Sequence, residues 1–295
     1  MSLLRTTHVP VQAPGAVGRL GVGTVQFGQA YGVSNKHGQV PRADVKLILE
    51  LAARTGIGLL DTAANYGEAE AVLGGNDLSS FRIVSKTLGV QHGVHAVIAR
   101  VHESVRALGA VDLLLVHSVK DLLGPSGATL WRALQALKAE GIIGGIGISA
   151  YVADNPAALA ERFRPDAMQL PFSLLDQRLL QDGSLARLKQ LGVEIHARSL
   201  FLQGLLFMPK PPEKLGSAGP MLEKVRAEIA GAGATPLAAA LGFVLSRPEI
   251  DVAVVGMTGL QQLQEIVASV LSPVPELDWT ACALKDERIL TPSLW

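Results

Sequence analysis

The feature that most restricts the fold of this chain is a regular alternation of short β-rich runs with stretches of helical periodicity. The β-rich runs lie at about 19–23, 57–61, 82–85, 111–116, 143–148, 167–170, 193–197 and 251–255. Helical spacing follows most of them, over 41–54, 68–73, 94–108, 130–140, 155–162, 184–191, 221–230 and 260–270. Parallel strands need crossover connections, usually helices, so the pattern predicts an α/β protein with a parallel sheet.

Eight such units in about 250 residues match a (β/α)8 TIM barrel. No Gly/Ser-rich or Pro-rich linker interrupts the alternation, so residues 1–295 are predicted to form a single domain. An extra helix is expected over Thr235 to Arg247, before the eighth strand. A doubly wound sheet is the alternative. Its dinucleotide fingerprint is missing, because Leu20 to Gln26 has only the first two glycines and no helical pattern follows directly.

Composition argues against several classes of protein. Lys plus Arg and Asp plus Glu both number 26, and no dense basic stripe indicates nucleic-acid binding. The single Cys282 cannot form an internal disulfide, and Met1 to Arg5 lacks the long apolar stretch of a secretory signal, which together favour the cytoplasm. The longest apolar run, Pro236 to Leu245, is about half of the roughly 20 residues that span a bilayer, so no membrane association is expected.

Reactive side chains end three consecutive predicted strands. Asp61, Lys86 and His117 hold these positions, and Tyr66 follows the first of them by five residues. Each alone has an ordinary explanation, as a turn cap, a surface amine or a core histidine. In a barrel, however, the carboxyl ends of the strands meet at one mouth, so these side chains are expected to lie together.

An acid, an amine, a phenol and an imidazole in one place can donate a proton to a carbonyl. A free phenol has a pKa of about 10, so it needs a neighbouring cation to act near neutral pH. Lys86 can supply that cation, and Asp61 would keep a buried ammonium charged. Negative charge that develops on the carbonyl oxygen would be stabilised by donors from Tyr66 and His117.

Longer segments around these residues resemble the signature of the aldo-keto reductase family. The similar segments are Gly56–Gly74, Val84–Thr87, Leu114–His117 and Gly144–Ser149, within a resemblance from about Leu20 to Val270. It implies a barrel that reversibly reduces aldehydes or ketones with NADPH or, less often, NADH. No metal site is expected. The resemblance further implies Tyr66 as the general acid, Lys86 as the cation that eases its ionisation, Asp61 as the partner of Lys86, and His117 as the donor that orients the carbonyl.

The same resemblance assigns the cofactor-binding residues. They are Gly23, Thr24, Asp61, Ser149, Gln169, Arg198, Ser199, Leu200, Gly204, Gly256, Thr258 and Gln262. Ser149 and Gln169 match residues that hold the nicotinamide carboxamide, while Ala150 replaces an asparagine common in the family. Arg198 replaces an aromatic residue in the segment that covers nicotinamide and pyrophosphate. Its guanidinium is suited to stacking on the nicotinamide, to approaching a phosphate, or to a structural ion pair.

Cofactor choice depends on the segment after the last predicted strand. Gly256 and Thr258 precede a helix whose N-terminus can accept a phosphate. Many NADP-specific relatives have a basic side chain near Gly256 or Gln262, and this chain has none. Gln262 can form a hydrogen bond but supplies no charge. NADP(H) is the favoured expectation, and NAD(H) stays open.

The substrate is expected to lie against Gln26, Tyr31 and His117. Trp295 is a further candidate that either stacks on the substrate or anchors the chain end. The connection 199–220 contains Pro-Lys-Pro-Pro and is long enough for a cofactor lid, and residues 271–295 form a tail expected near the mouth. Little charge in the mouth loops favours a neutral aldehyde, ketone or sugar-like carbonyl. The oligomeric state stays open.

Two other functions also stay open. One is a redox-sensing or regulatory subunit that retains a nicotinamide cofactor on the same barrel with little turnover, similar to the potassium-channel β subunits. The other is a lyase or aldolase that uses Lys86 as a Schiff-base amine. The family context of Tyr66 and His117 argues against the second.

Overall fold

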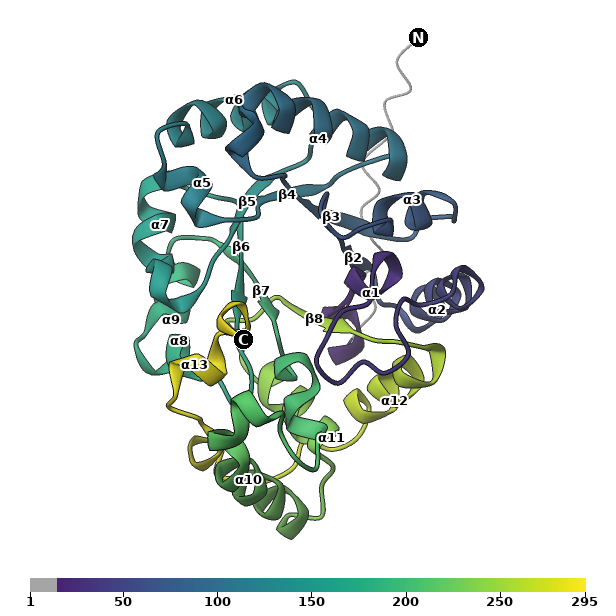
Figure 1. Cartoon of the computed structure of the whole chain (residues 1–295), viewed down its shortest axis with the longest axis vertical. Coiled ribbons are helices and arrows are strands. Elements are labelled where there is room, and N and C mark those ends of the chain that lie inside the picture. Colours follow the sequence, from purple (N-terminus) through teal and green to yellow (C-terminus); the bar gives the residue numbers. More distant parts are fainter. Residues whose placement is uncertain (1–14) are drawn as a thin grey trace.

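A computed structural model describes residues 15–295, which form a closed barrel of parallel strands surrounded by helices (Figure 1). The strands are β1 (Leu20–Gly23), β2 (Leu59–Asp61), β3 (Arg82–Lys86), β4 (Leu113–Val116), β5 (Ile146–Ser149), β6 (Ala167–Pro171), β7 (Glu194–Arg198) and β8 (Val252–Gly256). The predicted (β/α)8 barrel is confirmed. The doubly wound alternative is wrong, because β8 pairs with β1 and closes the sheet. The expectation for Met1 to Arg5 lies outside the described residues.

Helices follow the strands and cover the outside of the barrel. They are α1 (Val25–Gly28), α2 (Arg42–Thr55), α3 (Ala69–Gly74), α4 (Val94–Leu108), α5 (Val119–Leu123), α6 (Gly127–Ala139), α7 (Pro156–Phe163), α8 (Arg178–Gln181), α9 (Ser184–Gln190), α10 (Gly219–Gly231), α11 (Pro236–Leu245), α12 (Leu260–Val270) and α13 (Glu287–Leu290). Short 3-10 helices are η1 (Ala16–Arg19), η2 (Val90–His92), η3 (Val152–Asp154), η4 (Leu202–Phe207), η5 (Glu213–Ala218), η6 (Thr280–Cys282) and η7 (Pro292–Leu294). Every predicted helix is present, whereas α1, α5, α8 and α13 are too short to show a periodicity in the sequence.

The helix boundaries follow local chemistry. After α2, Gly56 takes a left-handed conformation (φ 86°) and its N–H donates to the carbonyls of Ala52 and Ala53, which ends the helix. Thr235 caps α11 by accepting a hydrogen bond from the Ala238 N–H, and Pro236 fits the first turn. Within residues 15–295 no single helix is long and apolar enough to cross a membrane. One pair, Glu213–Gly231 with Pro236–Leu245, passes by length and composition only and is bent by 87°.

The two-residue period of the strands divides the barrel interior into layers. On β3, the side chains of Arg82, Val84 and Lys86 point to the same side and follow one another from the amino end to the carboxyl end. The middle layer is an apolar cluster of Leu59, Val84, Leu113, Leu115, Ala167, Val252 and Val254. Polar residues therefore lie at both ends of the interior, separated by this cluster.

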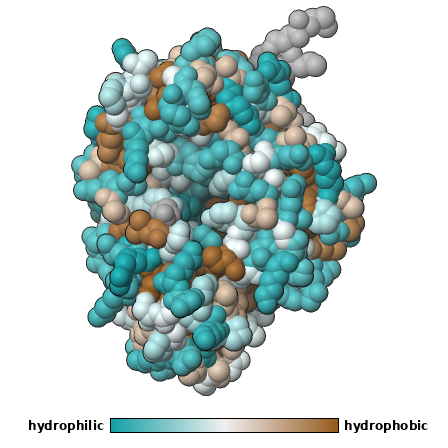
Figure 2. Space-filling model, in the orientation of Figure 1, coloured by the Kyte–Doolittle hydropathy of each residue, from teal (hydrophilic) through white to brown (hydrophobic). Residues whose placement is uncertain are grey.

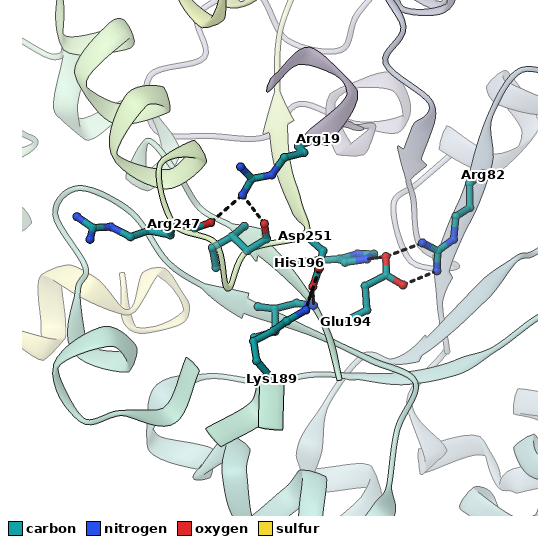
Figure 3. A network of polar contacts seen from close by, with 9 residues as sticks. Arg19, Arg82, Lys189, Glu194, His196, Arg247 and Asp251 are labelled. Carbon is teal, nitrogen blue, oxygen red and sulfur yellow. Dashed lines mark hydrogen bonds and ion pairs between the residues drawn. The ribbon is translucent and has the colours of Figure 1, made fainter. Parts of the chain in front are cut away.

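The polar layer at the amino end is an ion-pair network (Figure 3). Arg82 donates two hydrogen bonds to the Glu194 carboxylate, at 2.5 and 2.8 Å, and His196 Nε2 lies 2.8 Å from the same carboxylate. Beside it, Lys189 pairs with Asp251 at 2.8 Å, and Arg19 donates to the backbone carbonyls of Leu245, Arg247 and Ile250. Arg82 and Glu194 thus join the starts of β3 and β7, and Asp251, just before β8, accepts a hydrogen bond from the Ile195 N–H of β7.

The Glu194 carboxyl makes the stability of the barrel pH-dependent. Burial alone would raise its pKa, but hydrogen bonds from His196 and Arg82 outweigh burial and lower the pKa to about 2 from an ordinary 4.5. Because the pKa is lower in the folded state, the carboxylate stabilises the fold above pH 4.5, and this contribution is lost as the pH falls toward 2.

We predict that Glu194→Gln lowers the free energy of unfolding at pH 7 and makes its decline between pH 4.5 and 2 shallower than in the wild type. Urea denaturation at several pH values measures both effects. Glu161→Gln is the control, since Glu161 pairs with Arg187 where both side chains are about half exposed. Equal acid dependence in wild type and Glu194→Gln would contradict the prediction.

Candidate active site

A cavity of about 760 Å³ opens at the carboxyl ends of the strands. Figure 2 shows this face of the molecule hollowed near its centre. Every strand contributes a residue to the lining. Seven of these lie at or beside the carboxyl end of their strand, namely Gly23, Asp61, Lys86, His117, Ser149, Arg198 and Gly256, and Gln169 lies in the middle of β6. The volume is that of a small-molecule site, and this is the face on which barrel enzymes carry their chemistry.

A buried ion pair lies at the bottom of the cavity. Lys86 is 1% exposed, and its Nζ donates to Asp61 Oδ1 at 2.6 Å and to the Thr62 carbonyl at 3.0 Å. Gln169 Nε2 donates to the other carboxylate oxygen, Asp61 Oδ2, at 2.6 Å. Burial alone would lower the pKa of Lys86, but the negative charge of Asp61 and the nearby Tyr66 outweigh it and raise the pKa. Lys86 is thus held as an ammonium, which a Schiff-base amine cannot be when it attacks a carbonyl.

Tyr66 and His117 lie beside this ammonium. Lys86 Nζ is 4.9 Å from the centroid of the Tyr66 ring, and the Tyr66 and His117 ring centroids are 5.9 Å apart with their planes at 78°. Burial, followed by the positive charges of Lys86 and Arg198, lowers the pKa of His117 to about 4. The imidazole is therefore neutral at neutral pH. Within residues 15–295 its Nδ1 is buried and has no hydrogen-bond partner, so protonation at Nε2 avoids an unsatisfied buried donor.

The loop that carries Tyr66 is fixed from below by Glu70. This carboxylate accepts hydrogen bonds from Ser85, Ser104 and Arg100, and Arg100 also donates to the Ala64 carbonyl. Glu70 is 4% exposed, and its role was not predicted from the sequence. The only sequence signal is an acidic residue within the apolar pattern of the short helix α3.

Glycine is required where the Tyr66 loop crosses the turn after β1. A Cβ at Gly28 would lie 1.8 Å from the Tyr66 carbonyl oxygen, and one at Gly67 would lie 2.3 Å from the Gly28 carbonyl oxygen. Gly67 also has a φ of 55°. The two backbones therefore pack directly against each other, which places Tyr66 over the mouth of the barrel.

Two loops meet at the rim of the cavity. Ser34, in the connection after β1, donates to the Gln203 carbonyl at 2.9 Å, and Gln203 Nε2 donates to the Tyr31 hydroxyl at 3.3 Å. Ser199, Leu202 and Gln203 have positive φ values of 60°, 46° and 52°, so the start of the predicted lid has an unusual backbone conformation. Residues of both loops line the cavity. That segment 199–220 acts as a lid stays a prediction.

The end of the cavity beside β8 is lined by Gly256, Thr258, Gln262 and Glu265, none of which is basic, together with apolar neighbours. Gln262 Oε1 accepts a hydrogen bond from the Thr258 N–H at 2.8 Å. Lining residues that were not predicted include Asn65, Tyr151, Lys36, His37 and Glu265. Lys36 and His37 belong to the irregular connection after β1, and no pattern in its sequence predicts that these side chains line the cavity.

Of the site residues predicted from the sequence, Trp295 alone is outside the cavity lining. Its indole N–H donates to the Arg288 carbonyl at 2.9 Å. The tail packs on the segment after β6, where the Leu284 N–H donates to the Leu175 carbonyl and Gln177 donates to the Trp279 carbonyl. Trp295 bonds within the tail and packs, partly buried, against the apolar core, and its role at the chain end stays a prediction.

Residues 19–287 match the family model of the aldo/keto reductase family. The chain belongs to the aldo/keto reductase family. It is 29% identical to L-galactose dehydrogenase of Arabidopsis thaliana, over 90% of this chain and 89% of that protein. It is 27% identical to an uncharacterised oxidoreductase of Mycobacterium tuberculosis, over 89% of this chain and 87% of that protein.

The fold of this aldo/keto reductase is also found among solved structures. The holo form of an aldo-keto reductase from Bacillus halodurans superimposes with a TM-score of 0.71 at 20% identity, over 94% of this chain and 93% of that chain. The family prediction is confirmed, and the protein is an oxidoreductase of a family that acts on carbonyl compounds, typically with nicotinamide cofactors. The preference between NADP and NAD stays a prediction.

The ion pair of Lys86 and Asp61 can be tested by a double-mutant cycle. Lys86→Met and Asp61→Asn should each lower the free energy of unfolding by about 3–5 kcal/mol, because each leaves a buried partner uncompensated. The double variant should lose at least about 1 kcal/mol less than the sum. Urea denaturation measures these values. The exposed pair Arg42 and Glu68 is the control, with an expected coupling below about 0.5 kcal/mol, and additive losses for Lys86 and Asp61 would refute the coupling.

The ionisation of His117 is a separate prediction. Its ring should titrate with a midpoint near pH 4, because burial and two neighbouring cations disfavour the imidazolium. NMR of protein with isotopically labelled histidine measures the midpoint, and the signal that disappears in His117→Gln identifies the residue. A His117 midpoint near the ordinary 6.5 would show that the ring is not shielded as described.

Proposed function

We propose that this protein reduces an aldehyde or ketone with NADPH or NADH, and catalyses the reverse oxidation of the alcohol, with Tyr66 as the general acid. The observation that carries the proposal is the convergence of Asp61, Tyr66, Lys86 and His117 at one end of a cavity large enough for a small ligand. A fully buried ammonium beside a phenol and a neutral imidazole is suited to proton donation.

The cavity residues fit a nicotinamide cofactor. Gln169 gives its N–H to Asp61, so its carbonyl oxygen is left to accept a hydrogen bond from a carboxamide, and the Ser149 hydroxyl lines the same cavity as a donor. We propose that further lining residues contact the rest of the cofactor, including its pyrophosphate and its adenosine end. They are Gly23, Thr24, Asp61, Arg198, Ser199, Leu200, Gly204, Gly256, Thr258 and Gln262. When bound, the cofactor supplies the hydride, which no side chain can.

The side chains at the catalytic end of the cavity would donate the proton to the substrate. A substrate carbonyl oxygen would accept hydrogen bonds from the Tyr66 hydroxyl and His117 Nε2, and both donors would stabilise the negative charge that develops there. Tyr66 then gives its proton to that oxygen. The Lys86 ammonium stabilises the resulting phenolate, and Asp61 and Gln169 hold the ammonium in place. His117 is neutral, so it can donate a hydrogen bond without bringing a further positive charge.

NADP(H) is our favoured cofactor, and NAD(H) is the alternative. At the adenosine end, Gln262 is neutral and accepts a hydrogen bond from the Thr258 N–H, and Glu265 is acidic, so neither supplies a positive charge for a 2′-phosphate. Lys36 and His37 line the same cavity and are exposed, and these are the basic side chains that a phosphate can recruit. Titration with both cofactors decides between them.

For the substrate we propose a neutral aldehyde, ketone or sugar-like carbonyl. Gln26, Asn65 and Tyr31 line the cavity with uncharged polar groups that can bond to hydroxyls. The name of the related plant protein, L-galactose dehydrogenase, supports a sugar-like compound. Aldoses therefore belong in the first substrate panel.

The proposal predicts that the purified protein oxidises NADPH or NADH in the presence of 4-nitrobenzaldehyde. Tyr66→Phe should lower kcat by at least about 100-fold, because the proton donor is lost, and should leave the cofactor Kd within about twofold. Absorbance of the reduced cofactor measures turnover, and fluorescence titration measures Kd. Thr55→Val is the control, since it removes a hydroxyl that bonds within α2, away from the cavity.

Full turnover in Tyr66→Phe would refute the mechanism, and failure of both cofactors to bind would refute the function. Tight cofactor binding without turnover of any aldehyde, ketone or aldose would favour the regulatory alternative instead.

A further inference from the structure

Arg198 is a cation on the cavity wall that has no acidic partner among the described residues. It ends β7, and within residues 15–295 it forms no ion pair with a carboxylate. Its Nη2 donates to the Ala150 carbonyl at 3.2 Å and its Nη1 to the Ser199 hydroxyl at 3.3 Å. Of the three roles open from the sequence, the structural ion pair is therefore not the one observed.

The guanidinium plane is held in one orientation. Its Cζ lies 4.4 Å from the centroid of the Tyr151 ring, so one face is covered by an aromatic ring while the two hydrogen bonds hold its edge. Both Arg198 and Tyr151 line the cavity. The face of the guanidinium away from Tyr151 is therefore the one that a ligand can meet.

Arg198 belongs to the same wall as the residues that we assign to the carboxamide. In the barrel, β5 pairs with β6 at Ser149 and Gln169, and β6 pairs with β7 at Pro171 and Arg198. Three successive strands thus present Ser149, Gln169 and Arg198 to the cavity. A nicotinamide ring whose carboxamide bonds to Ser149 and Gln169 would lie next to Arg198. This step rests on the proposed function.

The charges at this end of the cavity leave Arg198 uncompensated. The Asp61 carboxylate is paired with the Lys86 ammonium, and its second oxygen is bonded to Gln169. His117 is neutral above about pH 4. The reacting end therefore carries a net positive charge, which comes from Arg198. An oxidised nicotinamide ring is itself a cation, whereas the reduced ring is neutral, so the two forms meet this charge differently.

We propose that Arg198 makes the protein bind the reduced nicotinamide cofactor more tightly than the oxidised one, by repelling the cationic ring. The overall reaction equilibrium is unchanged. In the direction of carbonyl reduction, however, the oxidised cofactor leaves readily and inhibits weakly as a product. Arg198 is thus a specificity-determining residue for the redox state of the cofactor.

The test is a set of equilibrium titrations on the full chain with NADH, NAD+, NADPH, NADP+ and ADP-ribose. In Arg198→Gln, the ratio of the Kd of the oxidised cofactor to the Kd of the reduced cofactor should fall by about tenfold. This change is smaller than the full repulsion between adjacent unit charges at an effective dielectric near 20 would produce. Arg198→Lys keeps the charge and should keep the ratio within about threefold.

Arg198→Tyr is a second neutral variant, and thermal unfolding checks that each variant folds. Arg187→Gln, outside the cavity, is the control for a lost guanidinium.

ADP-ribose separates this role from pyrophosphate binding. It contains the pyrophosphate but no nicotinamide ring, so its Kd should stay within about twofold in Arg198→Gln if the guanidinium acts on the ring. A parallel loss of affinity for ADP-ribose and for both redox forms, with an unchanged ratio, would assign Arg198 to the pyrophosphate and overturn the inference. An unchanged ratio with unchanged affinities would overturn it too. The proposed function fails separately, if wild-type protein binds neither cofactor.

Discussion

The buried ion pair between Lys86 and Asp61 is the interaction on which the site depends. An ammonium that is 1% exposed can stay charged only with a carboxylate in contact, and removal of either partner leaves a buried charge uncompensated. The pair joins neighbouring strands, and Gln169 extends it across the barrel to β6. The contacts that link β2, β3 and β6 therefore also hold the cation beside Tyr66.

In strand β3, the two-residue period of the side chains places residues that stabilise the barrel and a residue of the candidate site on the same face of the strand. Arg82 at its start pairs with Glu194, Val84 belongs to the apolar cluster, and Lys86 at its end faces the cavity. The apolar layer separates the two polar layers, so the ion pair at the amino end can stabilise the barrel without entering the site. A change at Arg82 is expected to act on stability, and a change at Lys86 on both stability and function.

The fold was predictable because the strands and long helices leave periodic signals, and because strand ends converge in a barrel. The candidate site was predictable where a reactive residue ends a strand, as Asp61 and Lys86 do, or directly follows one, as His117 does. Contacts that depend on packing between distant segments left no such signal. Glu70 supports the Tyr66 loop through Ser85, Ser104 and Arg100 from other elements. Likewise, the sequence left three roles open for Arg198, because its neighbours Ala150 and Tyr151 lie about 50 residues earlier in the chain.

The central claim is that the cavity built around the Lys86 and Asp61 pair reduces a carbonyl by direct hydride transfer from a nicotinamide. Transfer of deuterium from a cofactor labelled at the transferable position of C4 tests this claim most directly, with the alcohol product analysed by mass spectrometry and NMR. The account predicts that wild-type protein in ordinary water places one deuterium on the carbinol carbon of each product molecule. Formation of an unlabelled alcohol, or no alcohol from any aldehyde, ketone or aldose, would contradict it.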